Sequence, residues 1–141
     1  MTDAPPEVTV FAVDLIGLLG DASDAPQVMA LLRDTSAEVR AHAARALGRL
    51  GAEEAATELR GALDDRIPFV RVNAAHALGA IGDVFAAAAL ASQARVDGFD
   101  AADAAARALA RVSPEVLQAV AGERGAGPHL GQAADVARVQ A

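Results

Sequence analysis

The side chains of this sequence that could bind or transfer a group are arginines, carboxylates and three histidines. There is no cysteine, which excludes disulfides, thiol catalysis and zinc–thiolate sites. His42, His76 and His129 are widely separated along the chain and supply too few ligands for a metal site. No nucleophile beside a base, phosphate-binding loop or carboxylate pair stands out. We therefore predict no catalytic residue, no metal and no cofactor.

One set of polar residues recurs at a constant spacing along the chain: Asp14, Arg45, His76 and Arg107. Apolar residues flank each of them at helical spacing, so the four side chains should point away from a core. Two interpretations stay open. The column is either a solvated polar stripe with an Asp14–Arg45 pair of small energetic value, or a basic ridge that meets an acidic segment of a partner.

Three apolar residues replace polar ones at the same spacing. Ile67 and Phe69 stand at the positions that Ser36 and Glu38 occupy earlier in the chain, and Phe85 stands at that of Glu54. Such replacements indicate extra burial. Either the three residues pack within the chain, or they form a binding hot spot for a partner, where exposed aromatic residues are typical.

The spacing reflects an internal repeat. The stretch 34–51 (DTSAEVRAHAARALGRLG) recurs as 65–82 (DRIPFVRVNAAHALGAIG), with weaker copies on either side. A period of roughly 31 residues indicates a solenoid. Each repeat reads as two helices, with a capping Asp34 or Ser36 before the first and Gly51 after it. The first helices are predicted at about 7–19, 37–50, 69–81 and 99–112, and the second helices at 25–33, 53–63, 84–94 and 114–121.

These elements predict one solenoid over residues 1–121, with repeats at about 3–33, 34–64, 65–95 and 96–121. The first repeat departs most from the pattern, as expected of a terminal repeat that presents a solvent face. Residues 122–141 begin with a glycine-rich loop. They then either form a short capping helix over 129–139, with Leu130, Ala134 and Ala137 facing inward, or remain a frayed tail.

Composition narrows the classes of partner. Hydrophobic residues make up 53% of the chain but aromatic residues only 3%, so the core must rely on alanine and on closely spaced helices. The net charge of −7 argues against nucleic acid, whose phosphates need basic residues. The N-terminus lacks a signal-peptide pattern, and the longest apolar run, 84–91, is too short to cross a membrane. We therefore expect a cytoplasmic protein.

The repeated motif D-x-x-x-x-V-R-x-x-A-A-x-A-L-G-x-[LI]-G resembles HEAT repeats, and more narrowly the short bacterial type of phycocyanobilin-lyase-like proteins. The resemblance covers about residues 3–121. It implies an all-α, right-handed α-solenoid of four two-helix repeats. It also implies that Arg40 and Arg71 pair with acidic or backbone groups of adjacent repeats, with Asp34 and Asp65 as partners or caps in a structural ladder.

The resulting hypothesis is a non-catalytic protein-interaction module or adaptor, either a monomer or a weak homodimer. It would bind a protein partner on the surface of the second helices, with the apolar residues of the third repeat at the centre. The alternative is a bilin lyase or lyase-accessory subunit. Four phenylalanines, with no Trp or Tyr, are few for a bilin pocket. The His-Glu pairs of HEAT-like iron hydroxylases are replaced here by His42-Ala43 and His76-Ala77.

Overall fold

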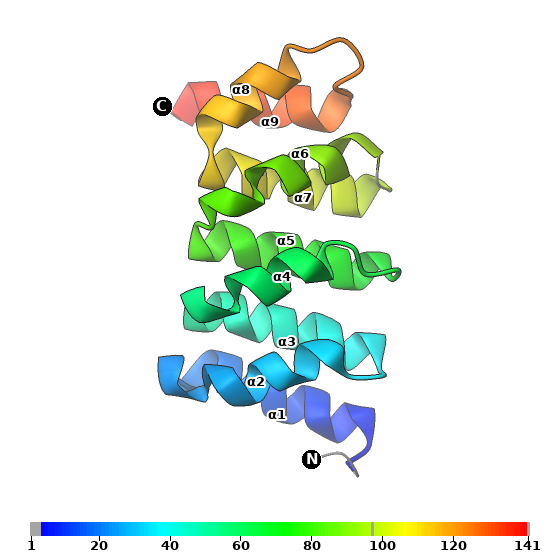
Figure 1. Cartoon of the computed structure of the whole chain (residues 1–141), viewed down its shortest axis with the longest axis vertical. Helices are drawn as coiled ribbons and strands as arrows, with labels where there is room; N and C mark the ends of the chain where they lie inside the picture. The colour runs from blue at the N-terminus through cyan, green and yellow to red at the C-terminus, as the bar shows by residue number, and fades with distance from the viewer. Residues whose placement is uncertain (1–3, 97, 141) are drawn as a thin grey trace.

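Helices account for all the regular structure in the part of the chain that is described, residues 4–96 and 98–140 of a computed structural model. They stack in pairs along one axis, so the predicted all-α solenoid is confirmed (Figure 1). The first helices of the four repeats are α1 (Pro6–Leu19), α3 (Ala37–Leu50), α5 (Pro68–Ile81) and α7 (Phe99–Val112). The second helices are α2 (Ala25–Ala30), α4 (Ala56–Ala62), α6 (Ala87–Val96) and α8 (Pro114–Ala121).

The first helices start within one residue of the predicted positions. Gly51 and Gly82 end α3 and α5 with φ of 64° and 78°, a left-handed conformation that only glycine adopts without a Cβ clash. The second helices of the first three repeats differ from the prediction of one continuous α-helix. Short 3₁₀ turns precede or follow their α-helical part, at Ala22–Asp24, Leu31–Arg33, Glu53–Ala55 and Val84–Ala86.

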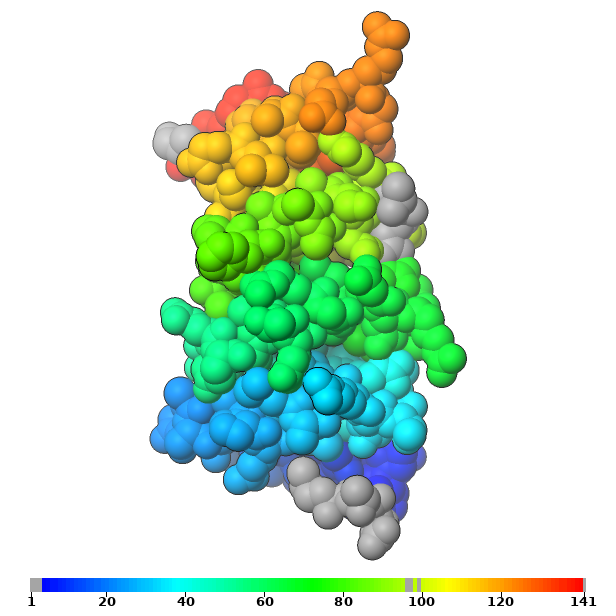
Figure 2. Space-filling model, viewed as in Figure 1, coloured from blue at the N-terminus to red at the C-terminus, as the bar shows by residue number. Residues whose placement is uncertain are grey.

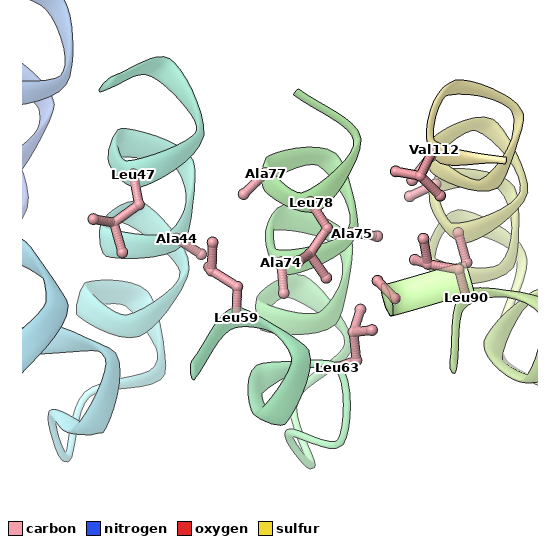
Figure 3. Close-up of a cluster of buried hydrophobic side chains, with 14 of the residues drawn as sticks. Ala44, Leu47, Leu59, Leu63, Ala74, Ala75, Ala77, Leu78, Leu90 and Val112 are labelled. Atoms are coloured by element: carbon pink, nitrogen blue, oxygen red, sulfur yellow. The ribbon is translucent and has the colours of Figure 1, made fainter. Parts of the chain in front are cut away.

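The repeats form layers that follow one another along the long axis in chain order (Figure 2). The core within them repeats with the same spacing as the sequence. Leu47, Leu78 and Leu109 of successive first helices are fully buried. Leu59 and Leu90, which occupy equivalent positions in the second helices, are also fully buried. Figure 3 shows Leu59 of α4 pointing into the space between α3 and α5. Each layer therefore buries its leucines against the next layer.

Small residues set the spacing of the first helices. A Cβ on Gly48 of α3 would lie 2.8 Å from the Cα of Ala77 of α5. A Cβ on Gly17 would lie 3.1 Å from the Cα of Ala46, and a Cβ on Gly79 would lie 3.2 Å from the Cα of Ala108. The backbones of neighbouring layers thus touch at one glycine–alanine contact per layer, which explains how a core so poor in large side chains packs closely.

The end of the chain forms a loop and one more helix, α9 (Pro128–Gln140), which lies beyond α7 and packs on α7 and α8 (Figure 1). Leu130 and Ala134 are fully buried, and Ala137 is partly buried against the core. Of the two interpretations of this segment, the structure shows the helix that covers the fourth repeat. None of the helices in the described ranges is long and apolar enough to cross a membrane.

Candidate functional site

An arginine–aspartate pair links the second repeat to the third. Nε and NH2 of Arg40 donate to the two carboxylate oxygens of Asp65, at 2.8 and 3.2 Å. NH1 of Arg40 also donates to the backbone oxygen of Asp34 at 2.9 Å. Both side chains of the pair are nearly buried, at 12% and 13% exposure. Such a bidentate, partly buried contact fixes the register of neighbouring repeats, which is a structural role.

The other two residues of the predicted ladder, Arg71 and Asp34, make hydrogen bonds to nearby backbone groups. Arg71 donates to the backbone oxygen of Asp65 at 2.8 Å. The Asp34 carboxylate accepts from the backbone N–H of Ser36 at 2.8 Å, as the Asp65 carboxylate does from Ile67 at 2.9 Å. The two aspartates thus cap the turns before α3 and α5. Burial would raise the pKa of Asp65, but its hydrogen bonds and the positive charge of Arg40 outweigh this and lower the pKa.

The structure divides the polar column of the first helices in two. In its first half, the Asp14 carboxylate of α1 accepts from Arg45 and bonds Nδ1 of His42, both at 2.8 Å. Burial would raise the pKa of Asp14, but these two partners have the larger combined effect, so the pKa lies below its ordinary value. Because Asp14 offsets the charge of Arg45, this half of the column is a closed ion pair and not a basic ridge.

The second half of the column borders a groove, which we call the α7–α9 groove. Its volume is about 650 Å³, and it lies between α7 and α9, with the end of α5 on one side. The floor is made of small residues such as Gly79 and Ala108. The polar and apolar groups that matter most along its walls are His76, Asp103, Arg107, Arg111, Val136 and Gln140.

The charges of the α7–α9 groove are unevenly paired. Nε of Arg107 donates to Asp103 at 2.7 Å, one helical turn away. Arg111 makes no hydrogen bond or ion pair with any described residue and lies at the surface. His76 is exposed, but partial desolvation and the charges of Arg107 and Arg111 lower its pKa, which Asp103 opposes. Sequence spacing points to His76 and Arg107, but it does not find Arg111 or the wall on α9.

The apolar residues of the third repeat are not brought together. Phe69, at the start of α5, is 50% exposed and its ring meets His42 edge-on at 6.1 Å between centroids. Phe85 lies beyond the other end of α5, is 80% exposed, and faces the guanidinium of Arg60 at 5.8 Å. Ile67 is half-buried in the turn before α5. Since α5 separates the two phenylalanines by about 20 Å at 1.5 Å per residue, they form no common patch.

The largest set of exposed apolar side chains lies on α1 instead. Four of them share one face and are between 41% and 66% exposed, and we call them the α1 stripe: Val8, Phe11, Leu15 and Leu18. The opposite face of α1 packs on α3 through Val13 and Gly17, which are buried. The helix is therefore apolar on two sides, one of which packs on α3 while the other is exposed to solvent.

The α1 stripe occupies the face with which every later first helix packs on its predecessor. Leu15 stands one repeat before Ala46, the alanine that meets Gly17. A further layer of the same kind would bring a glycine backbone against Leu15, where the internal layers need alanine. The sequence carries a signal for this stripe, because residues 8, 11, 15 and 18 follow the alternating three- and four-residue steps of a helix-pairing seam.

Comparison with known proteins shows the family to which this repeat architecture belongs. The family described as HEAT repeats matches the sequence over residues 1–66 and again over residues 25–110. The chain belongs to the HEAT-repeat family. A comparison with curated proteins gave no match.

Among solved structures, this HEAT-repeat chain is similar to a chain in the complex of CpcE and CpcF of phycocyanin lyase from Nostoc sp. PCC7120. The TM-score is 0.70 and the sequence identity is 23%. The match covers 98% of this chain but only 65% of the lyase chain. At this identity the likeness shows a shared fold, and the present chain spans about two thirds of the length of its structural neighbour.

Proposed function

We propose that this HEAT-repeat protein is a non-catalytic interaction module that binds a helix of a partner protein on the α1 stripe. The observation that carries the proposal is the exposure of four large apolar side chains on one face of the terminal helix. A contiguous exposed apolar face is typical of an interaction site. Membership of a family that presents extended surfaces to other proteins supports the same function.

The spacing of the α1 stripe favours a helix as its occupant. Val8, Phe11, Leu15 and Leu18 form a narrow seam with a seven-residue period, which pairs with a similar seam on a second helix. The bulk of Leu15 and Phe11 requires a wider separation than the glycine–alanine contacts inside the solenoid, within the usual range of about 8–10 Å. A separate helix with large apolar side chains meets this requirement better than another repeat of the same type.

The proposal moves the binding face from the second helices to the end of the solenoid. α3 lies between α1 and α5, so a helix bound on the outer face of α1 contacts neither Phe69 nor Phe85. Phe85 is also the most exposed aromatic residue among those described, which makes it a matched control: it has the same chemistry as Phe11 but lies off the stripe.

The test is affinity purification from the native host with three tagged forms, followed by quantitative mass spectrometry. We expect the wild-type protein and Phe85→Glu to recover the same partner. The double variant Phe11→Glu/Leu18→Glu should lose it by about 30-fold or more, the effect of removing a hot spot worth about 2 kcal/mol. All three forms should unfold at similar temperatures, because the exchanged side chains are exposed. Full recovery of the partner by the double variant would refute the proposal.

The mass of the purified protein in solution identifies one special case. Light scattering is compared for the wild-type protein and the double variant. If the wild type has twice the mass of one chain and the double variant has the mass of one chain, the partner helix is the α1 of a second copy.

A second candidate function is that of a bilin lyase subunit or lyase accessory protein. It is favoured by the fold shared with a chain of the CpcE–CpcF complex of phycocyanin lyase. The test is to add a free bilin and record the absorption spectrum. A shifted and sharpened band that saturates at one bilin per chain would support this function, and an unchanged spectrum would count against it.

A further inference from the structure

The α7–α9 groove has the size and the wall chemistry of a ligand site. Its volume of about 650 Å³ lies within the usual range for pockets that hold small molecules or short peptide segments. Most of its lining is apolar and comes from small residues of α7 and α9, together with Val136, which is 50% exposed. A ligand in the groove would cover Val136 and remove apolar surface from water.

The two arginines of the groove, Arg107 and Arg111, lie on the last two turns of α7. Arg111 extends over Gly79, with its Cδ 3.7 Å from the position of a Cβ on that glycine. The arginine stem therefore lies along the end of α5. The guanidinium is left at the groove with its five N–H donors and no described partner.

The balance of charge selects the anion. Arg107 and Arg111 supply two positive charges, and Asp103 removes one. A dianion such as phosphate would meet the Asp103 carboxylate with only one net positive charge to offset it. A carboxylate carries one negative charge, and its two oxygens match the parallel N–H donors of a single guanidinium.

We propose that the α7–α9 groove binds a carboxylate carried on an apolar body, with Arg111 as its anchor. The carboxylate pairs with Arg111, and the apolar body lies along Val136 and the alanines of α9. Gln140 and the outer N–H groups of Arg107 lie close enough to the groove to orient the ligand. This site is independent of the α1 stripe, since its residues come from α5, α7, α8 and α9.

The carboxylate can come from a free organic acid or from an acidic side chain in a peptide segment. Two probes separate these sources. One is 4-phenylbutyrate, a single carboxylate on an apolar body. The other is a short acetylated and amidated peptide of alternating leucine and glutamate. 4-Phenylbutanol has the same apolar body without the charge and is the matched control ligand.

The experiment is a titration of the full chain, followed by amide chemical shifts in two-dimensional NMR spectra. We expect 4-phenylbutyrate or the peptide to shift amides of α7 and α9 in a saturable way, and 4-phenylbutanol to bind at least tenfold more weakly. The probe with the higher affinity identifies the source of the carboxylate. Binding of the anion should also raise the pKa of His76, because it offsets the arginine charges that lower it.

The variants are Arg111→Gln and, as a matched control, Arg124→Gln in the exposed loop before α9. Arg111→Gln should weaken binding by about tenfold, the loss of one charge-assisted pair, while Arg124→Gln should leave it unchanged. Equal binding of the alcohol and the acid, shifts confined to α1, or an unchanged affinity in Arg111→Gln would each overturn the proposal. Thermal unfolding of both variants near the wild-type temperature excludes a folding defect.

Discussion

Asp65 joins two groups that belong to neighbouring repeats. Its carboxylate accepts from Arg40 of the preceding repeat and from the backbone of Ile67 in its own turn. Removing the charge leaves the Arg40 guanidinium nearly buried without its counterion, and such a loss costs more than the pair itself contributes. The residue therefore holds two repeats in register and caps α5 at the same time.

Asp65→Asn tests this role, because asparagine keeps the oxygen that caps the turn but loses the charge. We expect the free energy of unfolding at pH 7 to fall by about 2 kcal/mol, less than for a fully buried pair because water still reaches both groups. Urea titration measures the change. In Asp135→Asn, which breaks an exposed pair with Arg138, the change should stay within about 0.5 kcal/mol. Equal effects of the two substitutions would contradict the structural role of Asp65.

The pH dependence of the same variants follows from the pKa. The pKa of Asp65 lies below its ordinary value of 3.8 in the folded protein. Its contribution to stability is therefore fully present above about pH 4 and is lost as the pH falls through the folded pKa. The wild-type protein should lose this increment as the pH falls below about 4, and Asp65→Asn should not, so the two stability curves converge in acid. The pKa of Asp14 is also lowered, so both proteins should still lose some stability in acid.

Residues of this kind are predictable from sequence when the repeat carries them. Arg40 and Arg71 occupy the same position of successive repeats, and the resemblance to HEAT repeats implies that they pair with acidic or backbone groups such as those of Asp65. Arg111 and Val136 line the α7–α9 groove from two different helices, and α9 has no register partner in the repeats. No periodicity could therefore have paired them.

At the scale of elements, glycine and alanine decide how near two helices lie. Gly48 and Gly61 are both helical, but their surroundings differ: a Cβ on Gly48 would lie 2.8 Å from the Cα of Ala77, and a Cβ on Gly61 would meet nothing within 4 Å. The same substitution should therefore have opposite effects at the two positions.

Gly61→Ala should stabilise the protein by about 0.5–1 kcal/mol, because alanine is the better helix former and fills only solvent. Gly48→Ala gains the same helical preference but must push α5 away from α3, and we expect a net loss of about 1–3 kcal/mol. Differential scanning calorimetry of both variants measures the two shifts. A higher unfolding temperature for Gly48→Ala would show that the layers are not in backbone contact.

The sequence predicts where the first helices lie better than it predicts which side of each helix is covered. Capping residues and helical spacing place the first helices within one residue, since these signals are local. The departure of the first repeat from the pattern indicates a solvent face, but it does not predict that Phe11 and Leu15 lie on that face. Which side of an apolar helix is covered depends on the helices that pack on it, and α1 packs on α3.

The whole molecule has two unlike ends. α9 covers the C-terminal layer with Leu130 and Ala134 buried, whereas α1 packs on α3 with one face and leaves the α1 stripe bare. Because each repeat contacts only its neighbours, opening begins at an end and moves inward. The N-terminal end should open first.

Hydrogen exchange detected by mass spectrometry checks this order. Peptides from α1 should exchange faster than those from α3, α5 and α7, and those from α9 should be intermediate. A partner helix bound to the α1 stripe should slow exchange in α1 more than elsewhere. Slower exchange in α1 than in α5 without a partner would mean that the stripe is already covered.

The glycine–alanine contacts have a consequence for the relative orientation of the two proposed binding sites. At Gly48 the backbones of α3 and α5 are so close that no side chain there can adjust, so one added methyl group should tilt the layers that follow α3. The α1 stripe lies on one side of this contact between α3 and α5, and the α7–α9 groove lies on the other side. A substitution too small to unfold the protein would therefore change the relative orientation of two partners bound at these sites.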